Sequence, residues 1–308
     1  IRDRVWDENS KLMSGVVRKP DFLIIGAQKA GTTWLWNMLK SHPGTSLPRK
    51  KELHFFSASE NYARGIDSYW EWFRDSEEGC ITGEASTTYL SDKVAFFYNE
   101  VNRLEYDESL PALPELVLES VPDAKIIVSL RDPVRRAISA YFHFMRRGKL
   151  PVNRGLRRTV QEHPRLRILE LGDYATHLSP WFATFPREQI LVLVFEDDIV
   201  ANPASGLSKL YEFLGLEAMP LRVEQEKKVN KSWTWTQTVA NYYAGPLRRF
   251  VRKGPAAELI RRYDWLRNSA IKPGDIRYLQ DFYLPFRSVV SQLVEKDLDS
   301  WTYGTDYN

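Results

Sequence analysis

The chain of 308 residues contains 43% hydrophobic and 27% charged residues, a balance that is ordinary for a folded protein with a sizeable core. Its formal net charge of +3 does not by itself indicate nucleic acid binding, and its length fits one large α/β domain or two small ones. Cys80 is the only cysteine, which excludes an intrachain disulfide and an all-cysteine metal site and favours a reducing compartment.

The sequence has no pattern typical of a membrane segment or a secretory signal. No apolar run approaches the ~20 residues that a helix needs to span a bilayer, and the N-terminus lacks the signal-peptide pattern. We therefore expect no transmembrane segment and a cytoplasmic location. The chain begins with Ile1 rather than Met, so it is also compatible with an excised domain, and the oligomeric state is left open.

The first predicted element is a buried strand at Leu23–Ile25, followed by a short loop and a helix at Thr32–Ser41. Such a unit directs backbone N–H groups, a helix N-terminus and the Lys29 ammonium toward one point, which predicts a phosphate site. A Walker loop carries its lysine directly after the second glycine, whereas Lys29 comes two residues before Gly31. The sequence therefore predicts a phosphate-type ligand that is not a triphosphate.

Strand and helix patterns alternate along the rest of the chain. Further strands are predicted at Ile81–Gly83, Lys125–Leu130 and Gln189–Phe195, and helices at Pro203–Leu214, with Asn202 as its N-cap, and at Ser288–Asp297. This alternation predicts an α/β fold with a central, mainly parallel sheet flanked by helices. The irregular stretch 220–275 is predicted to form loops or a lid.

The segment Lys51–Phe56 places Glu52 and His54 two residues apart. In an extended segment these two side chains point to the same side, and either one is a candidate general base toward an acceptor hydroxyl or amine. The alternative is a solvated charged turn followed by a phenylalanine pair in the core.

A second candidate anion site follows the strand at Lys125–Leu130. Arg131 stands at its carboxyl end, where open α/β sheets bind ligands, and Ser139 lies about two turns into the next predicted helix. A guanidinium and a hydroxyl there can both reach a phosphate. The alternative is that Arg131 pairs with Asp132 or another nearby carboxylate and that Ser139 only packs.

A third group of residues begins at Gly172–Tyr174. Trp181 and Phe185 have the spacing of a helix face and are predicted to pack in the core. Tyr174, near the helix start, is the candidate for contacting a ligand.

In order and spacing, these motifs resemble the sulfotransferases that use 3′-phosphoadenosine 5′-phosphosulfate (PAPS), and most closely the branch of heparan sulfate sulfotransferases and their bacterial relatives. The resemblance rests on the loop with Lys29, Gly31, Thr32 and Thr33, on Lys51–Phe56, on Arg131-Asp132-Pro133 with Ser139 and Tyr141, and on 172–181, 213–216, 282–286 and Trp301. It runs from about residue 20 to residue 301. It implies one sulfotransferase domain over residues 1–308 with a P-loop-like phosphosulfate-binding loop.

The resemblance also implies roles for individual residues. The 5′-phosphosulfate is expected on Gln28, Lys29, Ala30, Gly31, Thr32, Thr33 and Trp34, with Lys29 beside the leaving oxygen, and the 3′-phosphate on Arg131 and Ser139, with Tyr174 and Lys228 as further nucleotide contacts. For Lys228 a solvated loop is the alternative. Glu52 is expected to be the general base, with His54 as its partner or as the alternative base. Fixed charges can stabilise the leaving adenosine 3′,5′-bisphosphate (PAP), so no metal is expected.

Two departures from the heparan-type enzymes concern the acceptor. Ala85 stands where those enzymes tend to have a lysine, and Cys80 cannot form the disulfide that is usual in eukaryotic members. Both favour a bacterial-type enzyme with a small or carrier-bound acceptor, although small-molecule, glycan, lipid and carrier-bound acyl acceptors all stay open. An ATP-dependent P-loop phosphotransferase and a non-catalytic nucleotide-binding module are the alternative functions.

Overall fold

A computed structural model describes residues 17–97, 104–151, 155–221 and 271–305. Its centre is a parallel four-stranded sheet of order β2-β1-β3-β4, and the strands are β1 (Phe22–Gly26), β2 (Gly83–Ala85), β3 (Lys125–Leu130) and β4 (Ile190–Val194). The predicted α/β fold with a parallel sheet flanked by helices is confirmed.

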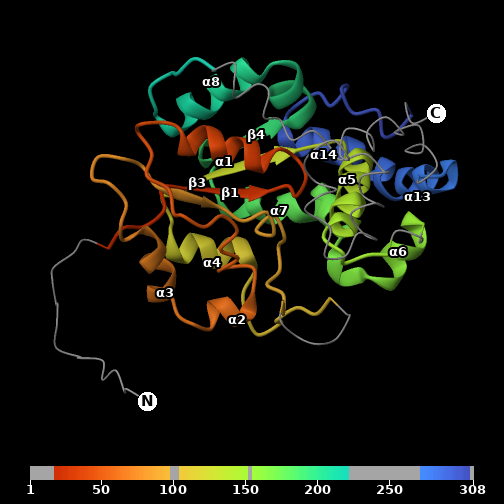
Figure 1. Cartoon of the computed structure of the whole chain (residues 1–308), viewed down its shortest axis with the longest axis horizontal. Coiled ribbons are helices and arrows are strands. Elements are labelled where there is room, and N and C mark those ends of the chain that lie inside the picture. Colours follow the sequence, from red (N-terminus) through yellow and green to blue (C-terminus); the bar gives the residue numbers. More distant parts are fainter. Residues whose placement is uncertain (1–16, 98–103, 152–154, 222–270, 306–308) are drawn as a thin grey trace, which may run out of the picture.

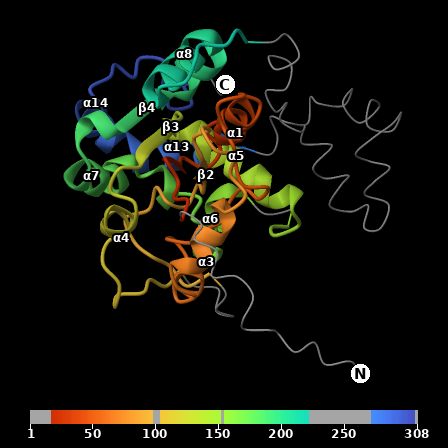
Figure 2. The same ribbon diagram turned by 90° about the vertical axis from the view of Figure 1, so that its left-hand side faces the viewer.

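Helices cover both faces of this sheet. They are α1 (Thr32–Lys40), α2 (Ser59–Tyr62), α3 (Asp67–Trp70), α4 (Leu113–Ser120), α5 (Pro133–Arg146), α6 (Leu156–Glu162), α7 (Tyr174–Thr184), α8 (Pro203–Leu214), α13 (Pro273–Tyr283) and α14 (Arg287–Val294). A π-helix, η5 (Phe195–Ala201), follows β4, and short 3₁₀ turns lie at Glu71–Phe73, Pro164–Leu166, Glu170–Gly172, Arg187–Gln189 and Leu284–Phe286. In both views α8 and α3 lie at opposite ends of the molecule, with the sheet between them (Figures 1 and 2).

The alternation of side chains along β1 divides the core into two layers. Phe22 and Ile24 pack with α1 and α8, whereas Leu23 and Ile25 pack with α4, α5, α7, α13 and α14 (Figure 1). Because both faces are covered, the strands are continuous apolar runs, which is why three of the four are visible in the sequence. A helix as short as α1 is marginal alone, so burial of its apolar face against the sheet holds it in place.

The helix boundaries follow local chemistry. The Asp132 side chain accepts a hydrogen bond from Arg135 N at the start of α5, and the Asp173 side chain accepts one from Thr176 N at the start of α7. Asn202 occupies the predicted N-cap position of α8, but its side chain makes no capping hydrogen bond. Pro203 at the first helical position supplies the favourable backbone angle there.

Two predicted elements are displaced in the structure. The second strand in the chain begins at Gly83, where the predicted one ends, and the last helix, α14, ends at Val294 instead of Asp297. Most of the stretch 220–275, including Lys228, lies outside the described residues. No helix in the described ranges is long and apolar enough to cross a membrane.

Candidate active site

The carboxyl ends of β1, β2 and β3 lie at one edge of the sheet because these strands are parallel. The segments that follow them carry Lys29, the run Ser86–Thr88 and Arg131. The chain thus brings together three sequence-distant segments at the edge where open α/β sheets hold ligands. Glu52 joins this edge because its N–H donates to Ala85 O at 2.9 Å.

The loop after β1 is anchored on β3. Ala27 N donates to Ser129 O at 2.7 Å, and Ser129 Oγ donates to Ala30 O at 2.6 Å. Gly31 at the N-cap of α1 has φ 86°, in the left-handed region that favours glycine, and no side chain caps the first turn of the helix. The first N–H groups of α1 are therefore left for a ligand, as expected for an anion site.

Glycine is also required at position 31 by packing. A Cβ there would lie 2.8 Å from Ile199 and 2.9 Å from the Phe195 ring, both on the π-helix η5. The loop and η5 therefore lie in direct contact. An alanine at this position would be strained by the positive φ and would require these two side chains to shift.

Lys29 lies in this loop with a half-buried side chain. Burial lowers its pKa to about 8, and the nearby charges of Arg146, Arg131, Arg147 and Lys51 lower it in the same direction. Within the described ranges, no carboxylate forms an ion pair with Lys29. A cation surrounded by other cations is the arrangement expected where a polyanionic ligand binds.

Arg131 extends from the end of β3 beside this loop. Its Nη1 donates to Lys29 O at 3.0 Å, and its guanidinium lies over the Phe195 ring, 4.7 Å from the centroid. The carboxylate beside it is that of Glu196, with Nε and Oε1 3.8 Å apart, and not that of Asp132, which accepts from Arg135 N and Tyr303 N. Burial raises the pKa of Glu196 to about 7, although the charge of Arg131 lowers it.

Ser139 lies half-buried on α5, on the same side of the helix as two basic residues of its last turn. Ser139, His143 and Arg146 follow one another at spacings of four and three residues and so share one helix face. Burial lowers the pKa of His143 to about 3, and Lys29 is the largest charge that lowers it further. This face of α5 therefore lies toward the Lys29 loop, which agrees with a shared role in anion binding.

Tyr174 is fully buried, and its hydroxyl is engaged with the backbone of Arg131. It donates to Arg131 O at 2.9 Å and accepts from Arg131 N at 3.4 Å. These two hydrogen bonds fix the backbone of Arg131. A direct contact of Tyr174 with a nucleotide stays a prediction. Trp181 and Phe185 are buried with stacked rings 5.7 Å apart, so their predicted core packing is confirmed.

The remaining loop residues differ in exposure. Ala30, Thr32 and Trp34 are buried, Gln28 is half-buried and Thr33 is exposed. Gln28 Oε1 and Trp34 Nε1 are buried and have no hydrogen-bond partner within the described part of the chain. Gln28 Oε1 lies in the loop, whereas Trp34 belongs to α1 and packs in the core with residues of α8.

Glu52 and His54 converge, but not for the predicted reason. Their φ angles are 65° and 55°, so the segment is not extended, and the predicted backbone is wrong. The side chains still meet, with His54 Nε2 3.9 Å from Glu52 Oε2. Glu52 Oε2 accepts from Thr87 N at 2.9 Å and from Thr87 Oγ1 at 3.2 Å, and its other oxygen pairs with Lys51.

The imidazole of His54 is held by one of its two nitrogens. Its Nδ1 forms a hydrogen bond of 2.8 Å with Thr88 Oγ1. Burial lowers the pKa of His54, and the Glu52 carboxylate opposes this effect. A neutral imidazole with Nε2 facing Glu52 can accept a proton, as a general base must. With 29% and 27% of their side chains exposed, Glu52 and His54 both remain accessible to an acceptor.

The sequence analysis missed two acidic residues at this edge. Glu196 follows β4 and lies against Arg131 and Asp132 N. Glu84 lies in β2, is fully buried, and accepts hydrogen bonds from three hydroxyl groups. In the sequence, both could have been recognised as acidic residues inside or directly after a buried strand.

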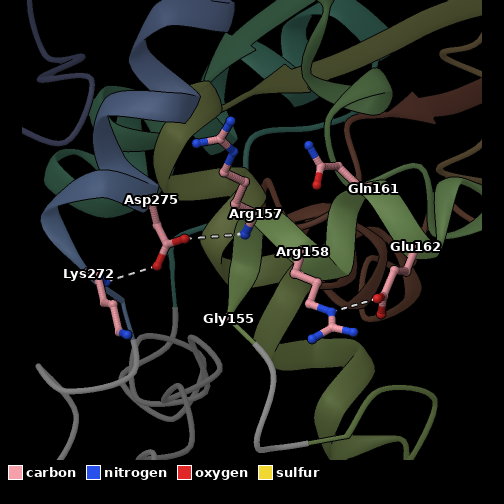
Figure 3. Close-up of a pocket in the computed structure, with 7 residues that line it drawn as sticks. All are labelled: Gly155, Arg157, Arg158, Gln161, Glu162, Lys272 and Asp275. Atoms are coloured by element: carbon pink, nitrogen blue, oxygen red, sulfur yellow. Dashed lines mark hydrogen bonds and ion pairs between the residues drawn. The ribbon is translucent and has the colours of Figure 1, made fainter.

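A separate hollow of about 550 Å³ lies between α6 and α13 (Figure 3). Its lining residues are Gly155, Arg157, Arg158, Gln161, Glu162, Lys272 and Asp275. Asp275 ties the two helices together, since its Oδ1 accepts from Arg157 N at 3.2 Å. None of the predicted site residues lines it, so this hollow is not part of the candidate site.

Among the residues that the structure describes, no group of three or more His, Cys, Asp or Glu side chains is placed to hold a metal ion. At this edge of the sheet the chain instead carries a half-buried lysine, an arginine and the Glu52–His54 pair. Such an arrangement is typical of α/β proteins that bind a phosphate-bearing ligand at the carboxyl edge of a parallel sheet, and Glu52 and His54 are of the residue types that take part in proton transfer.

The family is given by comparison with known proteins. The model of the family described as "Sulfotransferase domain" matches residues 19–283, so this chain belongs to the PAPS-dependent sulfotransferase family. It is an enzyme that transfers a sulfuryl group, and the family favours this activity over the ATP-dependent phosphotransferase and the non-catalytic module.

This chain aligns with different shares of the individual relatives' lengths. The chain is 30% identical over 213 residues to bifunctional heparan sulfate N-deacetylase/N-sulfotransferase 1 of Caenorhabditis elegans, with 65% of this chain and 22% of that protein aligned. It is 28% identical over 296 residues to heparan sulfate glucosamine 3-O-sulfotransferase 3A1 of Mus musculus, with 94% and 65% aligned. The chain thus spans about a fifth of the first relative's length.

A solved structure shares the fold. A sulfotransferase from Alicyclobacillus acidocaldarius superposes with a TM-score of 0.64 at 24% sequence identity, covering 92% of this chain and 99% of that one. The described helices and strands therefore form a sulfotransferase fold.

Proposed function

We propose that this enzyme moves a sulfuryl group from PAPS to an acceptor hydroxyl or amine, with Lys29, Glu52 and His54 as its catalytic residues. One observation carries the proposal: the half-buried Lys29 side chain, without a carboxylate partner in the described ranges, stands in an uncapped helix N-terminal loop among other cations. The acceptor oxygen or nitrogen attacks sulfur, the bond from sulfur to the bridging phosphate oxygen breaks, and PAP leaves. The acceptor's proton passes to the base.

The loop of residues 28–34 is proposed to hold the 5′-phosphosulfate. Its first-turn N–H groups and Lys29 supply positive charge where the leaving phosphate gains negative charge, which is fixed electrostatic stabilisation of the transition state. Arg131 and Ser139 are proposed to hold the 3′-phosphate. Tyr174 would then act by fixing the backbone of Arg131, through its hydrogen bonds of 2.9 and 3.4 Å. Lys228, outside the described residues, remains a further proposed contact.

The pair formed by Glu52 and His54 is proposed to take the acceptor's proton. The Glu52 carboxylate is oriented by Thr87 and charge-paired with Lys51, and His54 Nε2 lies 3.9 Å away. Glu52 is the proposed base, with His54 as its partner or as the alternative base.

The acceptor class is proposed from the site and the relatives' names. The relatives act on heparan sulfate by name, which favours a glycan, whereas Ala85 at the end of β2 supplies no charge for a sulfated polymer. Small-molecule, lipid and carrier-bound acyl acceptors therefore stand beside a glycan. We also infer that residues 1–308 form one domain, because α13 and α14 pack against α5 and α7 in the core shared with β1.

The donor is tested by binding and turnover. Unfolding of the protein is followed with PAP, with ATP·Mg²⁺ and with buffer alone, since a ligand well above its Kd raises stability by about 3 kcal/mol at a hundredfold excess. The proposal predicts stabilisation by PAP. Stabilisation by ATP·Mg²⁺ but not by PAP would contradict it, and a turnover assay with PAPS in the presence and absence of EDTA tests the predicted independence of metal.

A further inference from the structure

Glu84 is a fully buried carboxylate whose role the sulfuryl transfer itself does not explain. Three hydroxyl groups donate to it. Tyr69 Oη and Tyr89 Oη both donate to Glu84 Oε1 at 2.6 Å, and Ser86 Oγ donates to Glu84 Oε2 at 2.8 Å. The acceptor cannot reach Glu84, so this residue is not itself a candidate base.

Two of these hydroxyl groups hold the backbone of the segment that carries Glu52 and His54. Tyr89 Oη accepts from Phe55 N at 2.9 Å and from Phe56 N at 3.3 Å, and Ser86 Oγ accepts from His54 N at 3.0 Å. Three consecutive backbone N–H groups therefore donate to hydroxyl oxygens, and those hydroxyl groups themselves donate to Glu84. Within the described part of the chain, Tyr69 Oη accepts no backbone N–H.

The direction of each hydrogen bond follows from this arrangement. A hydroxyl group donates one proton and accepts through two lone pairs, so a proton directed at Glu84 leaves the lone pairs directed toward other donors. All three hydroxyl groups donate to Glu84, whose carboxylate only accepts when it is ionised. Burial raises the pKa of Glu84, and these three hydrogen bonds oppose that rise. Tyr89 and Ser86 are thereby fixed as acceptors toward residues 54–56.

We propose that Glu84 is a positioning residue that, by orienting the hydroxyl groups of Tyr89 and Ser86, holds the backbone that presents Glu52 and His54. The catalytic part of this inference rests on the proposed function. Glu52 and His54 both have left-handed backbone angles, which residues with a Cβ rarely adopt unless their surroundings impose them. The hydrogen bonds to residues 54–56 are such surroundings.

The two tyrosines form a matched pair for testing this. Both are buried, both donate to Glu84 Oε1 at the same distance, and both pack against Phe56. Tyr89→Phe removes the acceptor for Phe55 N and Phe56 N, whereas Tyr69→Phe removes only a donor to Glu84. A role in core stability alone lowers the stability of both variants, more for Tyr89→Phe because two buried N–H groups lose their acceptor, but leaves kcat of the folded enzyme alike in the two. A positioning role lowers kcat in Tyr89→Phe only.

The first readout is hydrogen exchange at the amides of Phe55 and Phe56, with residue resolution. Tyr89→Phe is expected to speed their exchange at least about tenfold relative to Tyr69→Phe at equal global stability. The second readout is turnover of PAPS, in which Tyr89→Phe is expected to lower kcat at least about tenfold with little change in the KM for PAPS. Tyr69→Phe is expected to keep kcat within about twofold of the unmodified enzyme.

Glu84→Gln is a third variant. Its amide NH₂ donates, so one hydroxyl group must turn to accept from it and can no longer be held as before. With the amide oxygen toward the two tyrosines and the NH₂ toward Ser86 Oγ, this variant is expected to speed exchange at the His54 amide and to lower kcat, and if it fails to fold, the tyrosine pair still decides. Equal exchange and equal kcat in the two tyrosine variants would overturn the proposal. A difference in exchange without any transfer by the unmodified enzyme would leave the positioning intact and contradict the proposed function.

Discussion

The lowered pKa of Lys29 predicts how nucleotide affinity depends on pH. With a pKa of about 8, the ammonium of the free enzyme is protonated in about 90% of molecules at pH 7 and in about 3% at pH 9.5. A bound phosphate raises that pKa because an opposite charge favours the protonated form. PAP affinity should therefore fall about thirtyfold between these pH values, which corresponds to about 2 kcal/mol.

Titration calorimetry with PAP at constant ionic strength measures this effect. Lys29→Met provides the reference, since it keeps the length of the side chain but has no proton to lose. Lys29→Met should bind PAP more weakly than the unmodified protein at pH 7 and about equally to it at pH 9.5. His177, with a pKa of about 9, titrates in the same pH range. Because both proteins contain it, its effect on the pH dependence of PAP affinity is the same in both.

Lys29→Arg provides a second control. A guanidinium stays protonated throughout this range, so the variant should bind PAP with little dependence on pH. The reasoning is refuted if the unmodified protein and Lys29→Met lose affinity in parallel from pH 7 to 9.5, because the titrating group would then lie elsewhere.

Three further predictions follow from other groups. Glu52→Gln should lower kcat more than His54→Ala does, by about 10²–10⁴-fold if Glu52 is the base. Glu196→Gln should tighten PAP binding a few-fold at pH 8.5 and leave it unchanged at pH 5.5, because only the ionised carboxylate, formed above a pKa of about 7, competes for Arg131. The pKa of His177 is raised to about 9, so its contribution to the free energy of unfolding is complete below about pH 6.5 and is lost as the pH rises through about 9. The unmodified protein should lose up to about 3 kcal/mol of stability over this range, and His177→Gln should lose less.

Each of these predictions has a contrary result. A larger loss for His54→Ala than for Glu52→Gln would reassign the base. Equal PAP affinities of Glu196→Gln and the unmodified protein at pH 8.5 would remove the competition for Arg131. Denaturant unfolding curves measured from pH 6 to pH 9.5 would contradict the third prediction if His177→Gln lost as much stability as the unmodified protein.

The sequence predicted the fold where burial leaves a pattern. Lys125–Leu130 is a strand with the predicted bounds because a strand covered on both faces is a continuous apolar run. Gly83–Ala85 was displaced in the prediction because its middle residue is a glutamate, and only three hydroxyl donors from elsewhere in the chain make that side chain compatible with the core.

The candidate site was predicted less completely. Lys29 and Arg131 could be placed because both follow strands whose carboxyl ends meet at one edge. The left-handed backbone of Glu52 and His54 leaves no trace in residue type, so the predicted extended segment was wrong. Glu196 was missed as a partner of Arg131 because their contact joins two segments more than sixty residues apart.

The central claim is that Lys29 assists a sulfuryl transfer from PAPS. Its most direct test is release of PAP from PAPS, measured by chromatography together with the mass of a sulfonated product, using a heparosan oligosaccharide, p-nitrophenol and a hydroxyacyl carrier conjugate as acceptors. We predict that the unmodified enzyme releases PAP and sulfonates at least one acceptor and that Lys29→Ala does neither. Near-normal PAP release and sulfonation by Lys29→Ala would contradict the claim.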